Sequence, residues 1–256
     1  MELEIVTLSK PGGRARNEDA CGVWSNQRTC FCVLADGAGG HGGGDVASKL
    51  VVKHALAWLR ATPSCSAAAL EAALRSANEA VVAAQKEEQR LQDMRSTAAV
   101  LGVDTLAAKA VWGHLGDSRI YCFRNGRVVV QTRDHSVVQS MVDAGYIGAR
   151  ELSSAQERSK LLCAMGDADH FEPEIKSGGF SIYQGDAFLL CTDGFWEYVR
   201  NDEMETGLAA SASAGDWLRG METLIVKNGR SEQDNYSAIA LWCREPDEAT
   251  RFLPEF

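Results

Sequence analysis

Three apolar, strand-like runs in this chain of 256 residues each lead directly into an aspartate. The runs FCVLADG, WGHLGDS and FLLCTDG reach Asp36, Asp117 and Asp193, and Asp234 precedes the last apolar run, YSAIALW. Carboxylates are rarely buried without a partner, so several of them at the ends of core strands are costly unless positive charge lies between them. A cluster of divalent cations with oxygen ligands supplies that charge most simply.

Charge and composition exclude several classes of protein. A net charge of -9 argues against nucleic acid or an anionic membrane as the main partner. The eight cysteines are scattered, with neither a CxxC pair nor the spacing of a zinc site, so we expect reduced thiols in a cytoplasmic protein. The sequence shows neither a signal peptide nor an apolar segment long enough to span a bilayer.

Predicted strands and helices come in groups rather than in alternation. We expect strands at about 3–8, 20–24, 30–35, 97–103, 109–115, 119–123, 127–131, 186–191 and 236–243, and helices at about 44–60, 66–90, 135–145, 202–212 and 215–227. This grouping favours an α+β fold with antiparallel sheets over a doubly wound parallel sheet. Because no linker or internal repeat divides the chain, we predict one domain over residues 1–256.

The glycine-rich loop DGAGGHGGGD, residues 36–45, contains the pattern GxGxxG. A dinucleotide site also needs an acidic residue about 20 positions later, and the chain has no Asp or Glu between Asp45 and Glu71. A phosphate loop is excluded because no GK[ST] follows. A flexible connector would explain the glycines but not the Asp36 and His41 among them. Glycines allow close approach of the backbone to a ligand, which suits a metal-binding loop.

The acidic residues are numerous enough for more than one cation. A pair of Mg²⁺ or Mn²⁺ ions needs several carboxylates, at least one of them bridging, and room for a water between the ions. The candidates are the four aspartates above and two acids of the segment RNEDA, namely Glu18 and Asp19. Any one of these aspartates is better explained as a turn residue, since Asp-Gly is common in turns. Their joint occurrence favours a metal centre.

Two further residues point to phosphate chemistry. Arg14 lies five residues before Asp19, and a guanidinium beside a divalent-metal site can bind a phosphate through two hydrogen bonds. A solvated turn residue is an equally good interpretation from chemistry alone. His41 could donate a proton to a leaving group near neutral pH, or it could be a loop histidine without a role.

Seven segments together resemble the metal-dependent serine/threonine protein phosphatases of type 2C, in their compact bacterial form. They run in family order over nearly the whole chain: RARNEDA (14–20), VLADGAGGHGGGDVAS (33–48), STAAVLGV (96–103), WGHLGDSRIYCFRNGRV (112–128), TRDHSVV (132–138), FLLCTDGFWEYV (188–199) and DNYSAIALW (234–242). The resemblance implies a four-layer αββα sandwich of two antiparallel sheets flanked by helix pairs, with metal ions at one end. Residues 146–175 correspond to the family's variable flap, which leaves substrate choice open.

The resemblance also implies which residues hold the two main ions. By that match Asp36 is the bridging ligand, and Gly37 offers its carbonyl to one ion. Asp193 and Asp234 are ligands of the other ion.

The remaining candidates have supporting roles by the same match. Glu18 and Asp19 act through metal-bound waters. Asp117, together with the aspartate at 193, resembles the third-metal site of bacterial members. Arg14 corresponds to the phosphate clamp and His41 to the general acid.

The function implied is hydrolysis of phosphoserine and phosphothreonine on proteins with two or three Mn²⁺ or Mg²⁺ ions. A hydroxide that bridges two ions attacks phosphorus in line, and no phosphoenzyme is needed. The expected partners are a phosphorylated protein and a cognate bacterial Ser/Thr kinase, and we expect a cytoplasmic monomer that binds neither nucleic acid nor membrane. A non-catalytic phosphoprotein-binding or scaffold module on the same fold is the alternative; the intact acidic set and Arg14 argue against it.

Overall fold

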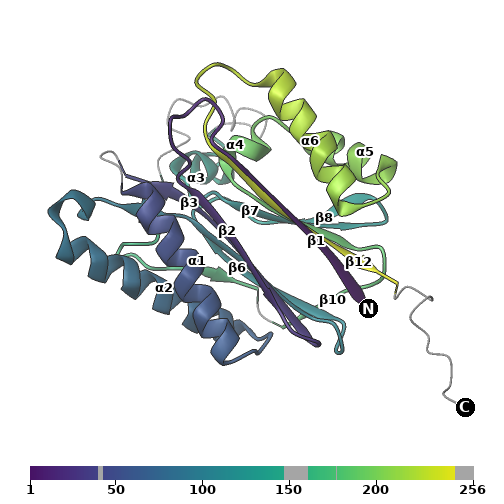
Figure 1. Cartoon of the computed structure of the whole chain (residues 1–256), viewed down its shortest axis with the longest axis horizontal. Helices are drawn as coiled ribbons and strands as arrows, with labels where there is room; N and C mark the ends of the chain where they lie inside the picture. Colours follow the sequence, from purple (N-terminus) through teal and green to yellow (C-terminus); the bar gives the residue numbers. More distant parts are fainter. Residues whose placement is uncertain (40–42, 147–160, 177, 246–256) are drawn as a thin grey trace, which may run out of the picture.

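Two antiparallel sheets lie against each other in the computed structural model, which describes residues 1–39, 43–146, 161–176 and 178–245. Each sheet carries a pair of long helices on its outer side (Figure 1). The four layers are therefore helices, sheet, sheet and helices. This arrangement agrees with the predicted α+β sandwich.

One sheet joins the two ends of the described chain. In spatial order its strands are β1 (Glu2–Lys10), β12 (Tyr236–Arg244), β11 (Ala187–Cys191), β7 (Arg119–Arg124) and β8 (Arg127–Gln131). Strands β1 and β12 pair along their whole length, from Glu2 opposite Arg244 to Lys10 opposite Tyr236. The first and last strands of the fold therefore support each other at the edge of this sheet.

The other sheet comes mostly from the first half of the chain. In spatial order its strands are β10 (Phe180–Ser181), β6 (Lys109–Leu115), β5 (Ala98–Asp104), β3 (Thr29–Ala38) and β2 (Asp19–Ser25). Two short strands extend it: β4 (Arg95–Ser96) pairs with β3, and β9 (Glu174–Ile175) pairs with β6. Strand β9, from a later part of the chain, thus pairs with the earlier strand β6.

Four long helices cover the outer faces of the sheets. They are α1 (Gly44–Ala61) and α2 (Ala67–Glu87) on the sheet of β2 and β3, and α5 (Asn201–Ala210) and α6 (Ala214–Asn228) on the sheet of β1 and β12 (Figure 1). Serine side chains cap two of them, because Ser66 accepts from the amide of Ala69 and Ser213 from that of Asp216. Short helical segments complete the fold: η1 (Gln89–Leu91), α3 (Val137–Asp143) and α4 (Asp193–Trp196).

The apolar runs of the sequence are continuous because both faces of the central strands are buried. In β3, Phe31 and Val33 contact the α1 and α2 layer, whereas Cys32 and Leu34 pack between the two sheets. A third cluster fills the space between the sheet of β12 and the helices α5 and α6. Buried strands of this kind read as near-continuous apolar stretches rather than as an alternating pattern.

The structure corrects some predicted boundaries. The strand expected at 30–35 continues to Ala38, because Gly37 and Ala38 pair with β4. Asp36 therefore lies within β3, and the prediction that it follows the strand is wrong. Helix α2 ends at Glu87 rather than near residue 90, and the helical turn that begins at Asp193 was not predicted.

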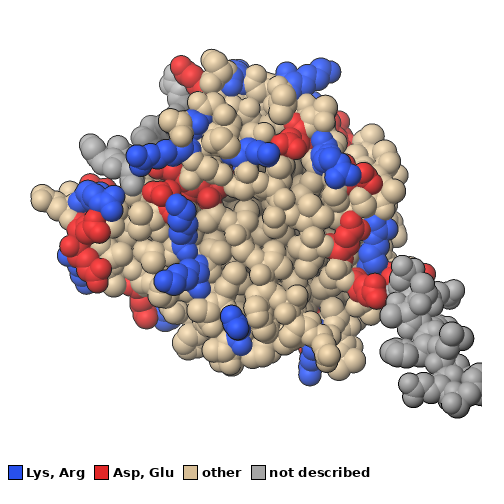
Figure 2. Space-filling view, in the orientation of Figure 1, with Lys and Arg blue, Asp and Glu red and all other residues tan. Residues whose placement is uncertain are grey.

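Charged side chains of both signs lie on the surface (Figure 2). On the face shown in Figure 2, basic side chains are interspersed with acidic ones rather than gathered in one patch. Within the described ranges, no helix combines the length and the apolar character that a crossing of the membrane requires.

Candidate metal centre

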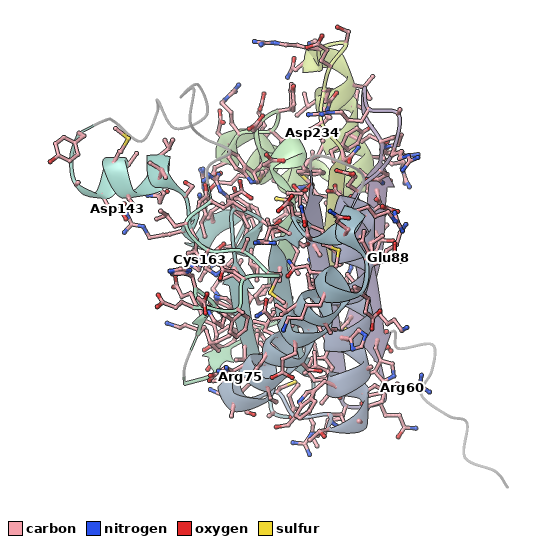
Figure 3. The ribbon with its side chains drawn as sticks, turned by 90° about the vertical axis from the view of Figure 1, so that its left-hand side faces the viewer. Arg60, Arg75, Glu88, Asp143, Cys163 and Asp234 are labelled. Atoms are coloured by element: carbon pink, nitrogen blue, oxygen red, sulfur yellow. The ribbon has the colours of Figure 1, made fainter. Side chains whose placement is uncertain are left out.

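The antiparallel order of the strands brings the acidic residues to one edge of the sandwich. Strands β3 and β6 run in the same direction because each pairs antiparallel with β5, so Asp36 and Asp117 lie toward the same edge. In the other sheet β11 ends where β12 begins, which adds Asp193 and Asp234. Asp234 lies near the top of the molecule in Figure 3. The chain topology thus brings four acids that are distant in the sequence to the same edge of the sandwich.

Asp36 and Asp19 form the centre of this group. They are directly opposite each other in the β2–β3 ladder. Burial raises the pKa of Asp36 well above its ordinary value, and the charge of Asp19 raises it further, followed by those of Asp193 and Asp117. Like charges opposite each other in a ladder are destabilising, so this pair needs a cation between or beside it.

Asp19 has a carboxylate oxygen without a hydrogen bond. Only 6% of the residue is exposed. Its Oδ2 accepts a hydrogen bond from Thr192 Oγ1 at 3.1 Å, but Oδ1 is buried with no hydrogen-bond partner among the described residues. Burial raises the pKa of Asp19 to about 7, and the charges of Asp193 and Asp234 also raise it. Such an orphaned oxygen fits a site that binds a hydrated cation.

Asp117 and Asp193 form the side of the centre next to α4. Burial raises the pKa of Asp117 well above its ordinary value, and the next largest cause is the charge of Asp193. The backbone carbonyl of Asp117 accepts a hydrogen bond from Trp196 Nε1 at 3.0 Å. Because Asp193 and Trp196 are the first and last residues of α4, this short helix fixes both acids relative to each other.

Arg14 lies at the exposed rim of the centre. Its Nη2 donates to Asp234 Oδ2 at 2.8 Å, while Asp234 Oδ1 accepts from the amide of Asn235 at 2.9 Å. Glu18 is close by. Burial raises the pKa of its carboxyl group, and the nearby charges of Asp45 and Asp234 raise it further. The guanidinium is therefore within reach of a ligand that approaches the acidic group from solvent.

Asn235 holds the N-terminal part of the site to the C-terminal part, and sequence reasoning did not identify it. Its Oδ1 accepts from the amide of Glu18 at 2.7 Å. Its Nδ2 donates to the carbonyls of Pro11 and Arg16 at 2.9 and 2.8 Å. One buried amide thus fixes the loop that carries Arg14 and Glu18. The only sequence signal is its position directly after Asp234.

Two glycines allow backbone segments to approach each other at the site. A Cβ at Gly37 would lie 2.0 Å from the carbonyl oxygen of Gly44, so any side chain there would displace the start of α1. Gly12 has a φ of +60°, and a Cβ there would lie 2.2 Å from the carbonyl oxygen of Asp234. The glycines therefore bring both ends of the site together, as expected for a metal-binding loop.

The structure brings together all but one of the candidate residues named above. His41 lies outside the described residues, as do residues 147–160 of the expected flap. The donor set is entirely oxygen and suits hard divalent ions such as Mg²⁺ and Mn²⁺. Within the described part of the chain, no three of these acids bring their oxygens within 4.8 Å of one another. That spread fits several hydrated ions better than one tightly caged ion.

The sandwich and its acidic edge define a class of protein. The profile of the family described as Protein phosphatase 2C matches residues 12–229, and the chain belongs to this family of metal-dependent serine/threonine phosphatases. The resemblance found in the sequence is therefore confirmed.

Known proteins agree with this assignment. The serine/threonine phosphatase stp of Listeria monocytogenes is 32% identical over 233 residues, which cover 88% of this chain and 90% of that protein. The structure of PstP/Ppp from Mycobacterium tuberculosis is 31% identical with a TM-score of 0.82, over 95% of this chain and 99% of that one. A structure of the PstP catalytic domain in complex with two manganese ions is 30% identical with a TM-score of 0.80, with the same coverage.

Proposed function

We propose that this chain hydrolyses phosphoserine and phosphothreonine in proteins with Mn²⁺ or Mg²⁺. One observation carries the proposal: Asp19 and Asp117 are buried and Asp36 is half-buried at one edge, with Arg14 at the rim. The charge of Asp193 raises the pKa of all three. A site that crowds several carboxyl groups together and has a guanidinium at its mouth suits metal ions first and a phosphate second.

Asp36, Gly37, Asp193 and Asp234 would hold a pair of ions, and Asp117 with Asp193 a third. When bound, such ions supply hydroxide near neutral pH and positive charge for the phosphoryl oxygens. Asp19 and Glu18 would accept hydrogen bonds from waters of the ions. The unpaired Oδ1 of Asp19 supports this role, because a carboxylate that binds water needs a free acceptor atom.

Arg14 would orient the phosphate. Its guanidinium already donates to Asp234 at 2.8 Å, so one edge is held by the site while the rest is open to solvent. A phosphoryl group can accept two parallel hydrogen bonds from arginine, which fixes its direction as well as its position. The proton for the leaving hydroxyl would come from His41 or from a water of the ions.

The biological role proposed is that of a cytoplasmic monomer that opposes a bacterial Ser/Thr kinase. The net charge of -9 supports protein rather than nucleic acid as the substrate class. The names of the similar proteins support serine and threonine as the residues dephosphorylated.

Hydrolysis of p-nitrophenyl phosphate and of a phosphothreonine peptide tests the proposal. We expect turnover with Mn²⁺, none with EDTA, and a loss of at least about 1000-fold in Asp36→Asn, since a metal centre contributes several kcal/mol. Asp216→Asn, in an exposed pair on α6, is the matched control and should retain full activity. Turnover that survives EDTA would contradict the metal mechanism. Bound Mn²⁺ without any turnover would favour the phosphoprotein-binding module.

A further inference from the structure

A second group of metal-ligating side chains lies outside the carboxylate centre. His114, His135 and Glu174 each offer one donor atom, and these three atoms all lie within 4.8 Å of one another. They come from three separate segments: β6, the stretch before α3, and β9. None of the three has a part in the phosphatase site described above.

The backbone fixes these residues relative to one another. His114 and Glu174 are direct partners in the antiparallel β6–β9 ladder, so their side chains leave the sheet on the same face. The amide of His135 donates to the carbonyl of Gly116 at 2.9 Å, and its carbonyl accepts from Leu162 at 2.8 Å. The rings of His114 and His135 have centroids 4.6 Å apart. The cluster is therefore built by the fold and not by chance side-chain positions.

His114 has a buried ring nitrogen that makes no hydrogen bond within the described part of the chain. Its Nε2 lies 2.7 Å from the carbonyl oxygen of Arg133. A carbonyl can only accept, so Nε2 carries the proton and Nδ1 keeps its lone pair. The residue is 1% exposed, and Nδ1 has no hydrogen-bond partner in the described part of the chain. Histidines that bind metals commonly donate their other ring N–H to a backbone carbonyl in this way.

His135 and Glu174 complete a ligand set. Nε2 of His135 lies 3.8 Å from Glu174 Oε2, which is too long for a hydrogen bond. Two ligands of a tetrahedral zinc ion are about 3.4 Å apart, so a small shift would bring both atoms onto one ion. Burial and the neighbouring His114 lower the pKa of His135, which keeps the ring neutral and able to ligate. The side chain of Glu174 is 64% exposed and leaves a path from solvent.

We propose that His114, His135 and Glu174 form a zinc-binding site separate from the carboxylate centre, with water as the fourth ligand. The two sites differ in chemistry, since imidazole nitrogens suit Zn²⁺ whereas an all-oxygen set suits Mg²⁺ and Mn²⁺. Two histidines with one glutamate and one open position is a common zinc arrangement.

A zinc ion there would add a cross-link between segments that already contact one another. It would tie β9, at the end of residues 161–176, to β6 and to the stretch before α3. His114 lies three residues before Asp117, and the amide of His135 binds the carbonyl of Gly116. The zinc site would therefore restrain the strand end that presents Asp117 to the carboxylate centre.

Zinc titration of the metal-stripped full chain by calorimetry, in excess Mg²⁺ to fill the carboxylate centre, tests the site. We expect one equivalent of Zn²⁺ in the unmodified chain. Loss of even an outer-shell partner weakens a metal site by about 10–100-fold, so Glu174→Gln and His135→Asn should weaken zinc by at least about 100-fold. Glu172→Gln and His170→Asn are the control variants, because both residues are exposed and lie in the same segment as Glu174, residues 161–176. Both variants should bind zinc as the unmodified chain does.

Cobalt absorption identifies the ligands independently. Co²⁺ at a site with two imidazoles and few ligands absorbs visible light much more strongly than Co²⁺ among six oxygens, and a cysteine ligand would add a charge-transfer band. We expect the strong bands without the sulfur band, and their disappearance in Glu174→Gln, an exposed position whose change does not threaten folding. The absence of zinc binding in excess Mg²⁺, or equal affinity in Glu174→Gln and His135→Asn, would overturn the proposal.

Discussion

The chain holds aspartates of its interior in two contrasting ways. Asp134 is almost fully buried, and both of its oxygens accept from Arg119, from Nε and from Nη2, at 2.8 Å. The guanidinium of Arg119 also lies over the ring of Trp196, 3.5 Å from its centroid. Asp186 is paired in the same way with Arg124, at 3.0 and 2.8 Å. In both pairs the carboxylate has a positive charge from the protein itself.

The metal edge lacks this arrangement. Burial and neighbouring acids raise the pKa of Asp19 and of Asp36, and no arginine pairs with either among the described residues. Arg14 pairs with Asp234 at this edge, but at the exposed rim. A buried carboxylate paired with arginine thus has a structural role. A group of carboxylates without an arginine partner can bind an external cation. The difference lies in the partner and not in the burial.

Asp134→Asn tests the aspartates that are paired with arginine, and it should have the largest effect on stability. It leaves the buried guanidinium of Arg119 without its counter-charge, and breaking a buried ion pair costs about 3–5 kcal/mol. Denaturant unfolding in the presence of EDTA measures the change in the free energy of unfolding. Asp216→Asn removes an exposed pair that solvent screens, so it should cost much less than Asp134→Asn. Equal costs for the two variants would mean that Arg119 does not depend on Asp134 for its counter-charge.

Addition of Mn²⁺ tests the metal edge. At a concentration of 100 times its Kd, a cation that binds only the folded state stabilises it by about 2.7 kcal/mol. We expect this gain in the unmodified chain and its loss in Asp36→Asn. The same variant should be more stable than the unmodified chain in EDTA, because it removes one of the repelling charges. Destabilisation of Asp36→Asn in EDTA would show that the carboxylate is not strained without metal.

Much of the fold could be predicted because the core strands are long and apolar. Strands such as β3 and β11 pack on both faces, so their sequences stand out from the loops. The two-residue strands β4, β9 and β10 carry no such signal. They exist because a longer strand offers its edge, as β6 does to β9, and that is decided by tertiary contacts.

The candidate site was found for a similar reason, since its acids adjoin apolar runs. Asn235 also adjoins an apolar run, but it carries no charge that would indicate a metal site. Its three hydrogen bonds depend on a loop more than 200 residues away in the chain. His114 and His135 were given no role from the sequence. Their proximity to Glu174 arises from the β6–β9 pairing, which the sequence does not reveal.

The pH dependence of the metal-free protein sharpens the contrast further. The pKa of Asp19 is raised to about 7 in the folded protein, so the folded state retains this proton to higher pH than the unfolded chain. The associated stability is present below about pH 4 and is lost as the pH rises through about 7. Because the neighbouring acids titrate together with Asp19, we expect one joint loss of stability over this pH range. Unfolding of Asp19→Asn in EDTA should lack this loss, and parallel pH curves for both proteins would contradict it.

Arg14→Ala should change stability least, although it also breaks an arginine–aspartate pair. The side chains of Arg14 and Asp234 are 57% and 48% exposed, and exposed pairs contribute about 0–1 kcal/mol. The pair of Arg219 and Asp216, at 70% and 45% exposed, makes Arg219→Ala a matched control for unfolding measurements. The two variants should unfold alike, but only Arg14→Ala should lower kcat/KM, by about 10–100-fold, since a hydrogen bond to a charged group contributes about 1.5–3 kcal/mol. A large loss of stability in Arg14→Ala would instead place this arginine with Arg119, as a structural counter-charge rather than a phosphate ligand.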